Sequence, residues 1–242
     1  MRTQMIDYPE QVAMCVFPDE PADLASAISL LGLEGGYPVI VLIGGGIQEQ
    51  QAVVTRQAIQ TLAKTAEDTK ALVICGGTDM GIMADIGEER WQKHYAFPLI
   101  GITLEALVTW PGGPRSTKFL WWGKKRWMLA PRYSHFILVP GNEFGDESPW
   151  IVDAATILSK DHRSVTVLMN GGSVSRKDIA LSVEKGRPVI AFGGTGRLAN
   201  ELAVEPHKNN LITAVLANSE QRVGDAVRAA LSINKRSAPA RY

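Results

Sequence analysis

The sequence predicts an α/β fold, a parallel sheet covered by helices on both faces. Runs of continuous apolar residues alternate with helical patterns along the 242-residue chain, and such runs are typical of strands buried on both faces of a parallel sheet. Five of the runs also end in glycine, which lets a strand turn directly into the following helix. No linker-like stretch interrupts the alternation, so we expect residues 1–242 to form a single domain.

The expected elements follow in order along the chain. Apolar runs mark strands at residues 12–17, 38–43, 71–75, 98–103, 135–140, 165–170, 188–192 and 211–217. Helices are expected from near Pro21, after Gly46 to about Ala66, after Gly77 to about Tyr95, from Ser148, from a cap at Ser175, from Thr195 and from Ser219. Pro149 at the first helical position and Asp178 three residues after Ser175 both mark helix starts. We expect residues 233–242 to form a flexible tail.

Composition is that of an ordinary globular protein. Hydrophobic residues make up 45% and charged residues 21%, and 25 basic residues balance 25 acidic ones. This balance gives no overall attraction to nucleic acid or to a membrane surface, and the apolar runs are too short for a signal peptide or a membrane span. Cys15 and Cys75 lack metal-type or disulfide-type spacing. We therefore expect a cytoplasmic protein without a metal site.

The glycine turns predict a phosphate site at one edge of the sheet. Parallel strands bring their carboxyl ends to the same edge, and the helices that follow add unpaired N–H groups and a positive dipole end. Singly, each glycine turn could also serve only to reverse the chain. The predicted ligand contacts are Gly44, Gly45, Gly46, Gln48, Gly76, Gly77, Thr78, Asp79, Gly81, Gly141, Asn142, Gly171, Gly172, Gly193, Gly194, Thr195, Gly196 and Arg197.

Neither standard phosphate motif fits these turns. Gly76 and Gly81 have the glycine spacing of a Walker loop, but Ile82 stands where lysine is required. The GxGxxA match at residues 194–199 comes late in the chain instead of in the first βαβ unit. The chain is therefore expected to be neither a P-loop NTPase nor a conventional Rossmann dehydrogenase.

Six blocks of the sequence carry a family resemblance. They read GGGIQ (44–48), ICGGTDMGIMADIGE (74–88), IGIT (100–103), YSHFILV (133–139), MNGG (169–172) and KGRPVIAFGGTGRLANELA (185–203). In this order they resemble the cytoplasmic N-terminal domain of melastatin-type TRP channels, a member of the SLOG superfamily, in its free-standing prokaryotic form. The resemblance implies a Rossmann-like sheet that binds ADP-ribose, NAD or a cyclic ADP-ribose-like molecule. We accordingly expect a sensor in signalling or defence that requires no cofactor and reports to a separate effector protein.

An enzyme is the alternative that the resemblance leaves open. Lonely-guy relatives cleave nucleotide N-glycosidic bonds and carry PGGxGTxxE, whereas this chain reads PGNEFGDES at residues 140–148. Asn142 replaces the second glycine, and Glu147 follows Gly141 by six residues instead of seven. If the protein is an N-glycosidase, Glu143 and Glu147 are the candidate catalytic carboxylates. Otherwise these acids favour the helix that starts at Ser148.

An insertion at residues 110–132 interleaves tryptophan with basic residues. It is expected either to contact the ligand as a lid or to form the contact of a homo-oligomer, a dimer or larger. The residues concerned are Trp110, Arg115, Lys118, Trp121, Trp122, Lys124, Lys125, Arg126, Trp127 and Arg132. Single-stranded DNA binding, as in the DprA branch, is a second alternative function. His135, at the start of an apolar strand, is expected to be structural.

Overall fold

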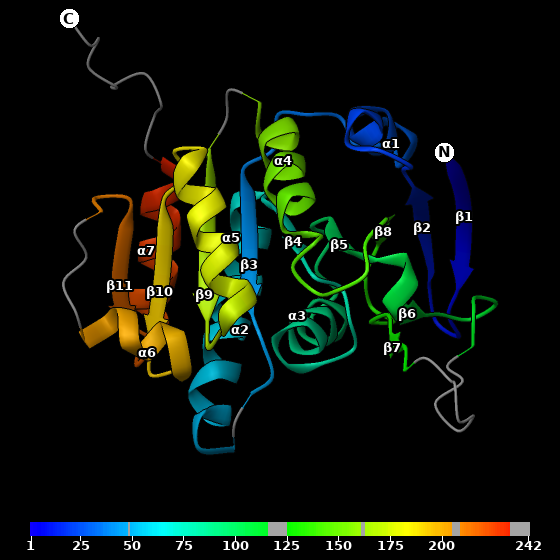
Figure 1. Cartoon of the computed structure of the whole chain (residues 1–242). Helices are drawn as coiled ribbons and strands as arrows, with labels where there is room; N and C mark the ends of the chain where they lie inside the picture. Colours follow the sequence, from blue (N-terminus) through cyan, green and yellow to red (C-terminus); the bar gives the residue numbers. More distant parts are fainter. Residues whose placement is uncertain (48, 116–124, 161–162, 205–208, 233–242) are drawn as a thin grey trace, which may run out of the picture.

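The computed structural model describes residues 1–47, 49–115, 125–160, 163–204 and 209–232. It has one sheet of nine strands in the order β1-β2-β8-β5-β4-β3-β9-β10-β11, flanked by helices (Figure 1). All strand pairs in this sheet are parallel except β1 with β2. The predicted α/β, Rossmann-like fold is confirmed, with one antiparallel edge strand added to it. No helix in the described part of the chain is long and apolar enough to cross a membrane.

The strands of this sheet are β1 Arg2–Asp7, β2 Val12–Phe17, β3 Val39–Gly44, β4 Leu72–Cys75, β5 Leu99–Leu104, β8 His135–Val139, β9 Ser164–Met169, β10 Val189–Gly193 and β11 Ile212–Leu216. A separate pair consists of β6 Val108–Thr109 and β7 Trp127–Met128. The helices are α1 Leu24–Leu30, α2 Ala52–Thr69, α3 Gly81–Gln92, α4 Ser148–Ser159, α5 Ser173–Glu184, α6 Arg197–Val204 and α7 Glu220–Ser232, with short 3-10 turns at Pro21–Asp23, Glu49–Gln51 and Glu105–Leu107.

Several helices begin at a different residue from the one predicted. Helix α3 was expected directly after Gly77, but its N-cap is Met80 and its first residue is Gly81. The N-cap of α5 is Gly172, and Ser175 lies inside the first turn. In both places the cap gives the backbone no side-chain hydrogen bond, so the usual capping residues were a poor guide.

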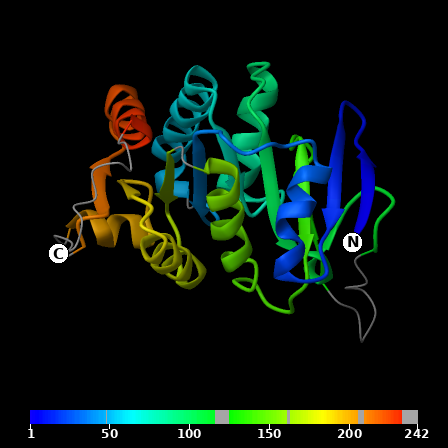
Figure 2. The ribbon, with the colours of Figure 1, turned by 90° about the horizontal axis from the view of Figure 1, so that it is seen from above.

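Helices cover both faces of the sheet and enclose two apolar cores (Figure 2). On one face α2, α3 and α7 bury side chains such as Leu62, Ile86 and Val227. On the other face α1, α4, α5 and α6 bury theirs, among them Ile151 and Leu198. Strands with both faces buried explain the unbroken apolar runs in the sequence.

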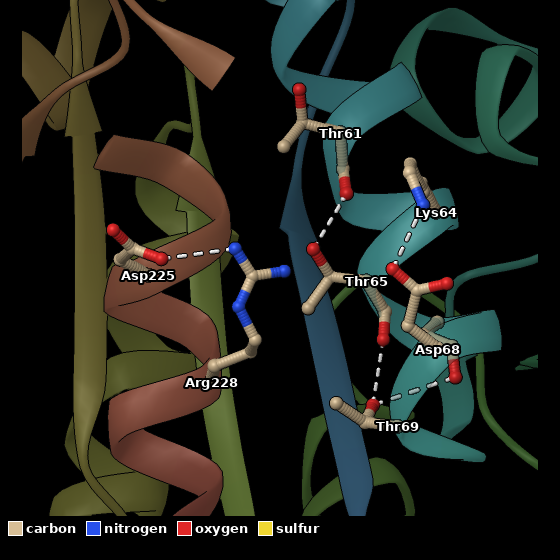
Figure 3. Close-up of polar contacts among 8 residues, drawn as sticks. Thr61, Lys64, Thr65, Asp68, Thr69, Asp225 and Arg228 are labelled. Atoms are coloured by element: carbon tan, nitrogen blue, oxygen red, sulfur yellow. Dashed lines mark hydrogen bonds and ion pairs between the residues drawn. The ribbon is translucent and has the colours of Figure 1, made fainter. Parts of the chain in front are cut away.

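Helices α2 and α7 pack side by side, and several of their polar groups bond within their own helix (Figure 3). The hydroxyls of Thr65 and Thr69 each donate to the carbonyl one turn earlier in α2, at 2.8 and 2.7 Å. Arg228 pairs with Asp225 within α7 at 2.9 Å. Because these groups are bonded within their own helices, the apolar side chains hold the two helices together.

The order of strands reverses beside β3. From β3 the chain adds β4 and β5 on one side, and α4 later carries it back to β9 on the other side of β3. The loops that follow β3 and β9 therefore lie next to each other at the carboxyl edge. In doubly wound sheets this switch point is where ligands bind.

Candidate functional site

A cavity of about 300 Å³ opens at the carboxyl edge of the strands. Glycine turns, apolar side chains and two carboxylates form its wall, which consists of Leu42, Ile43, Gly44, Gly46, Gly76, Thr78, Met80, Met83, Thr103, Trp127, Phe144, Glu147, Ile151, Val174 and Asp178. Its volume is at the lower end of the range for small-molecule sites. None of the described residues in this wall is Lys, Arg or His.

The turns after β3 and β4 pack backbone against backbone. A Cβ added to Gly44 would lie 2.0 Å from the carbonyl oxygen of Met169, at the end of β9. Gly81 has φ of +53°, and a Cβ there would lie 2.6 Å from the carbonyl oxygen of Gly45. Glycine is therefore needed at both positions for the turns of β3, β4 and β9 to meet.

Asn170 joins the turns after β3, β9 and β10. This fully buried residue donates from Nδ2 to the carbonyl of Gly46 at 2.8 Å. Its backbone N–H donates to the Thr195 hydroxyl at 2.9 Å. Asn170 Oδ1 has no partner within the described segments. The residue thus fixes the position of three turns while keeping one acceptor unused.

We call the surface formed by Asn170, Gly171, Gly172 and Arg197 the Arg197 ledge. A Cβ on Gly172 would lie 2.8 Å from a guanidinium nitrogen of Arg197, so this cation lies directly against the turn. Arg197 is exposed and forms no hydrogen bond or ion pair with another described residue. Helix α5 starts immediately after Gly172, and the N–H groups in the first turn of a helix, which lack partners within the helix, can bind an anion.

Glu147 brings one carboxylate to the cavity. It is 6% exposed, and its Oε2 accepts a hydrogen bond from the Gly145 N–H at 2.7 Å. Burial raises the pKa of Glu147, while backbone N–H groups and Lys177 act in the opposite direction. Lys177 itself donates to the Gly145 carbonyl at 2.6 Å, outside the cavity wall.

Asp178 brings the second carboxylate, from α5. Its exposure is also 6%, and burial raises its pKa to about 6. Ser148, the polar group beside it, offsets part of this rise, and the Glu147 charge adds to it. Asp178 Oδ1 and Ser148 Oγ nevertheless have no hydrogen-bond partner among the described residues. One oxygen of this carboxyl group is therefore left without a hydrogen bond by the described residues.

The described end of the insertion lines part of the cavity. Trp127 lies in the wall, with the Lys125 ammonium 3.5 Å from its ring centroid. The Asp79 N–H donates to the Met128 carbonyl at 2.8 Å, and the Ala130 N–H donates to the Gly77 carbonyl at 2.9 Å. The insertion is therefore fastened to the turn after β4, and the Asp79 N–H is not free for a phosphate.

The other insertion residues have different roles. Trp110 is buried and packs on Phe17, with ring centroids 5.8 Å apart, so it belongs to the core. Arg126 donates to the carbonyls of Glu105 and Val108, and Arg132 pairs with Glu10 and Glu88. Arg115 is exposed. The remaining insertion residues Lys118, Trp121, Trp122 and Lys124, and the expected tail 233–242, lie outside the described residues.

The structure gathers some of the predicted ligand contacts and separates others. Those in the cavity wall are Gly44, Gly46, Gly76 and Thr78, and the candidate catalytic carboxylate Glu147 lies there too. Gly171, Gly172 and Arg197 form the ledge beside it. The Gly194 and Gly196 N–H groups both donate to Asn200 Oδ1, at 2.7 and 3.1 Å, so these two predicted contacts are already occupied. Gln48 lies outside the described residues.

The loop after β8 keeps most of its predicted contacts away from the cavity. Glu143 is exposed and is not part of the wall, unlike Glu147. The N–H groups of Asn142 and Glu143 donate to Asp146 Oδ2 at 2.9 and 3.2 Å, and these bonds hold the pKa of Asp146 below its ordinary value. Asp146 thus shapes the loop. His135 starts β8, at the opposite end of the strand, and burial lowers its pKa to about 4, as suits a structural residue.

Sequence reasoning missed Asp178 and Asn170 as site residues. Asp178 was assigned to a helix start, yet it lies one turn after Val174 on the face of α5 that meets the cavity. Asn170 carried a usable signal, because an asparagine before two glycines suits the left-handed conformation that it adopts, with φ of +62°.

Comparison with solved structures supports the fold. The structural-genomics X-ray structure of TM1055 has a TM-score of 0.55 and 16% identity, over 79% of this chain and 99% of that one. The molybdenum cofactor carrier protein from Chlamydomonas reinhardtii has a TM-score of 0.52 and 17% identity, over 81% and 99%. The molybdenum cofactor binding protein from the phototrophic bacterium Rippkaea orientalis has a TM-score of 0.51 and 17% identity, over 80% and 96%.

Comparison with protein families gives the affiliation. No curated protein matches the chain. The family model described as SLOG in TRPM, prokaryote, matches residues 37–234, which include every strand from β3 to β11 and both halves of the site. The chain therefore belongs to the prokaryotic TRPM-type SLOG family, as the six sequence blocks predicted.

Proposed function

We propose that the protein is a sensor that binds a nucleotide-derived ligand such as ADP-ribose, NAD or a cyclic ADP-ribose-like molecule. The observation that carries the proposal is the pairing of an apolar cavity with the Arg197 ledge at the switch point of the sheet. A nucleotide has the same two parts, a flat ring and a charged phosphate. Membership of the SLOG family favours this class of ligand.

Charge sets the direction in which such a ligand would lie. Glu147 and Asp178 are the charged groups of the described cavity wall, and both are acidic. A phosphate inside the cavity would meet like charge in a poorly solvated place. On the ledge it would meet the Arg197 guanidinium and the start of α5, which suit phosphate oxygens. We therefore place the ring in the cavity and the phosphate on the ledge.

Thermal-shift measurements with AMP, ADP-ribose, NAD and cyclic ADP-ribose test the proposal. A ligand at about 100 times its dissociation constant should stabilise the fold by about 2.7 kcal/mol. Arg197→Ala should weaken binding by roughly tenfold to a hundredfold, since a hydrogen bond to a charged group contributes about 1.5–3 kcal/mol. Arg222→Ala, which removes an exposed arginine on α7, is the matched control and should leave affinity unchanged. Equal losses of affinity in the two variants would contradict the assignment of the phosphate to the Arg197 ledge.

A nucleotide N-glycosidase is the second candidate, favoured by one observation. Glu147 is a buried carboxyl with a raised pKa in a cavity that suits the ring end of a nucleotide. Such a group can stabilise positive charge on the ribose or activate water. Incubation with AMP, NAD and cyclic ADP-ribose, followed by chromatography, would detect free base. Release of adenine or nicotinamide that disappears in Glu147→Gln but persists in Glu143→Gln would show that the protein is an N-glycosidase and would contradict the sensor proposal.

A further inference from the structure

We propose that Asp178 recognises an exocyclic amino group on the heteroaromatic ring of the ligand, and so selects amino-bearing bases such as adenine over their oxo counterparts. The inference rests on the proposed function, because it concerns the ring end of the same ligand.

The first step is the unsatisfied state of Asp178. A buried carboxyl group without hydrogen bonds destabilises a fold, and native proteins rarely keep one without a use. The Ser148 hydroxyl is close enough to lower the pKa of Asp178 as a hydrogen-bonding neighbour, but its geometry falls outside that of an ordinary hydrogen bond, so Asp178 Oδ1 has no partner in the described part of the chain. No hydrogen bond from a backbone N–H of these residues reaches the side chain either. Helix α5 does not use it as a cap, since Gly172 holds that position.

The second step is the place of Asp178 within the cavity. Val174 and Asp178, one helical turn apart, both belong to the wall, so this face of α5 is turned toward the space. Glu147 contributes to the same wall, but the Gly145 N–H already occupies its Oε2. Lys177 is bonded to the Gly145 carbonyl outside the wall. Asp178 is therefore the carboxylate of this wall that no backbone N–H of a described residue holds, and a ligand in this space would meet its side chain.

The third step is the shape and polarity of the remaining wall. Trp127 and Phe144 offer aromatic surface, and Met80 offers a thioether. Met80 and Phe144 are 39% and 40% exposed, which leaves apolar surface in the wall for a flat ring to cover. A ring between such walls presents its edge to the polar groups.

The Asp178 carboxylate would distinguish rings that carry an amino group at their edge from rings that carry a carbonyl oxygen there. An ionised carboxylate only accepts hydrogen bonds, so it pairs with an amino group such as N6 of adenine or N4 of cytosine. The carbonyl oxygen of hypoxanthine or uracil at the same position would face the carboxylate as a second acceptor. Sites that hydrogen-bond a substrate N–H reject analogues that lack it, because a buried polar group is then left unpaired.

Calorimetric titration of the full chain with AMP and IMP tests the proposal, with adenosine and inosine as the phosphate-free pair. The wild type should bind AMP at least about tenfold more tightly than IMP, and adenosine should keep the same preference over inosine at lower affinity. Asp178→Leu, which has no acceptor, should abolish the preference. Asp178→Asn, which keeps one acceptor oxygen, should retain part of it. Arg197→Ala should weaken AMP and IMP equally, and Asp153→Asn, an exposed acid on α4, should change neither.

The outcomes separate this inference from the proposed function. Equal binding of AMP and IMP by the wild type, or a preference that survives in Asp178→Leu, would overturn the amino-group assignment and leave nucleotide binding intact. If the wild type prefers adenosine to inosine but binds AMP no more tightly than adenosine, the amino-group assignment is supported and the nucleotide proposal is refuted. Failure of all four compounds to bind would overturn the amino-group assignment, and the proposed function would fall with it only if ADP-ribose, NAD and cyclic ADP-ribose also gave no thermal shift.

Discussion

Ionisation of the buried Asp178 carboxyl group lowers the stability of the folded protein. Its pKa of about 6 compares with an ordinary value of 3.8, and burial is the main cause. Glu147 raises this pKa further, whereas Ser148 and Lys177 lower it. A protein can tolerate such a group at a binding site, because functional sites often give up stability for activity.

Asp178→Asn is therefore expected to stabilise the free protein, by about 3 kcal/mol at pH 8. The folded state holds the Asp178 proton more tightly than the unfolded chain, so stability is lost as the pH rises from about 4 through about 6. The gain in the variant should be complete at pH 8 and smaller at pH 5. Urea unfolding at the two pH values measures it. Destabilisation at both would mean that the carboxyl supports the fold, and Asp153→Asn, whose exposed ion pair contributes little, serves as control.

At the scale of elements, the strand-end turns decide the geometry of the site. The turn after β3 passes so close to β9 that residue 44 has no room for a side chain. The next residue, Gly45, has open space around its Cβ position. Two adjacent glycines in one turn thus differ in their physical role.

Gly44→Ala is expected to destabilise the protein by roughly 1–3 kcal/mol, because the new methyl group would overlap the Met169 carbonyl and the Ile82 side chain. Gly45→Ala, in the same turn, should change stability by less than about 0.5 kcal/mol. Urea denaturation midpoints of the two variants measure the difference. A loss in Gly45→Ala as large as in Gly44→Ala would contradict this packing.

The described end of the insertion contributes ring surface to the site. Trp127→Ala should weaken ligand binding by about tenfold or more, since stacking of a base on an aromatic side chain contributes roughly 1–3 kcal/mol. Trp127→Phe should retain most of the affinity. Trp91→Phe, a half-buried tryptophan on α3 that packs with Arg132 outside the cavity, is the control. Titration of all three variants with AMP would refute the stacking role if Trp127→Ala bound like wild type.

At the scale of the whole molecule, the alternation of apolar runs and helical patterns predicted every strand of the main sheet except β1. That strand escaped notice because most of its side chains are exposed, so it has no apolar run. The glycine turns were predicted, but it was not predicted that α5 lines one cavity together with the turns after β3 and β4. It depends on β9 lying beside β3, a matter of strand order that a single sequence does not display.

The same strand order explains why the two halves of the site have opposite charge. Glu147 comes from the loop before α4 and Asp178 from α5, while Arg197 begins α6, two strands away from β3. The acidic cavity and the basic ledge meet at the turns of β3 and β9. In the proposed function, this polarity across the switch point determines which end of a nucleotide-derived ligand would enter the cavity.

A crystal structure of the protein with bound AMP or ADP-ribose tests that claim most directly. We expect the adenine ring inside the cavity against Trp127, with its amino group within hydrogen-bond distance of Asp178. The phosphate oxygens should lie on the ledge, against Arg197 and the first N–H groups of α5. Density for the phosphate between Glu147 and Asp178, or for the ligand on another face of the sheet, would contradict the account.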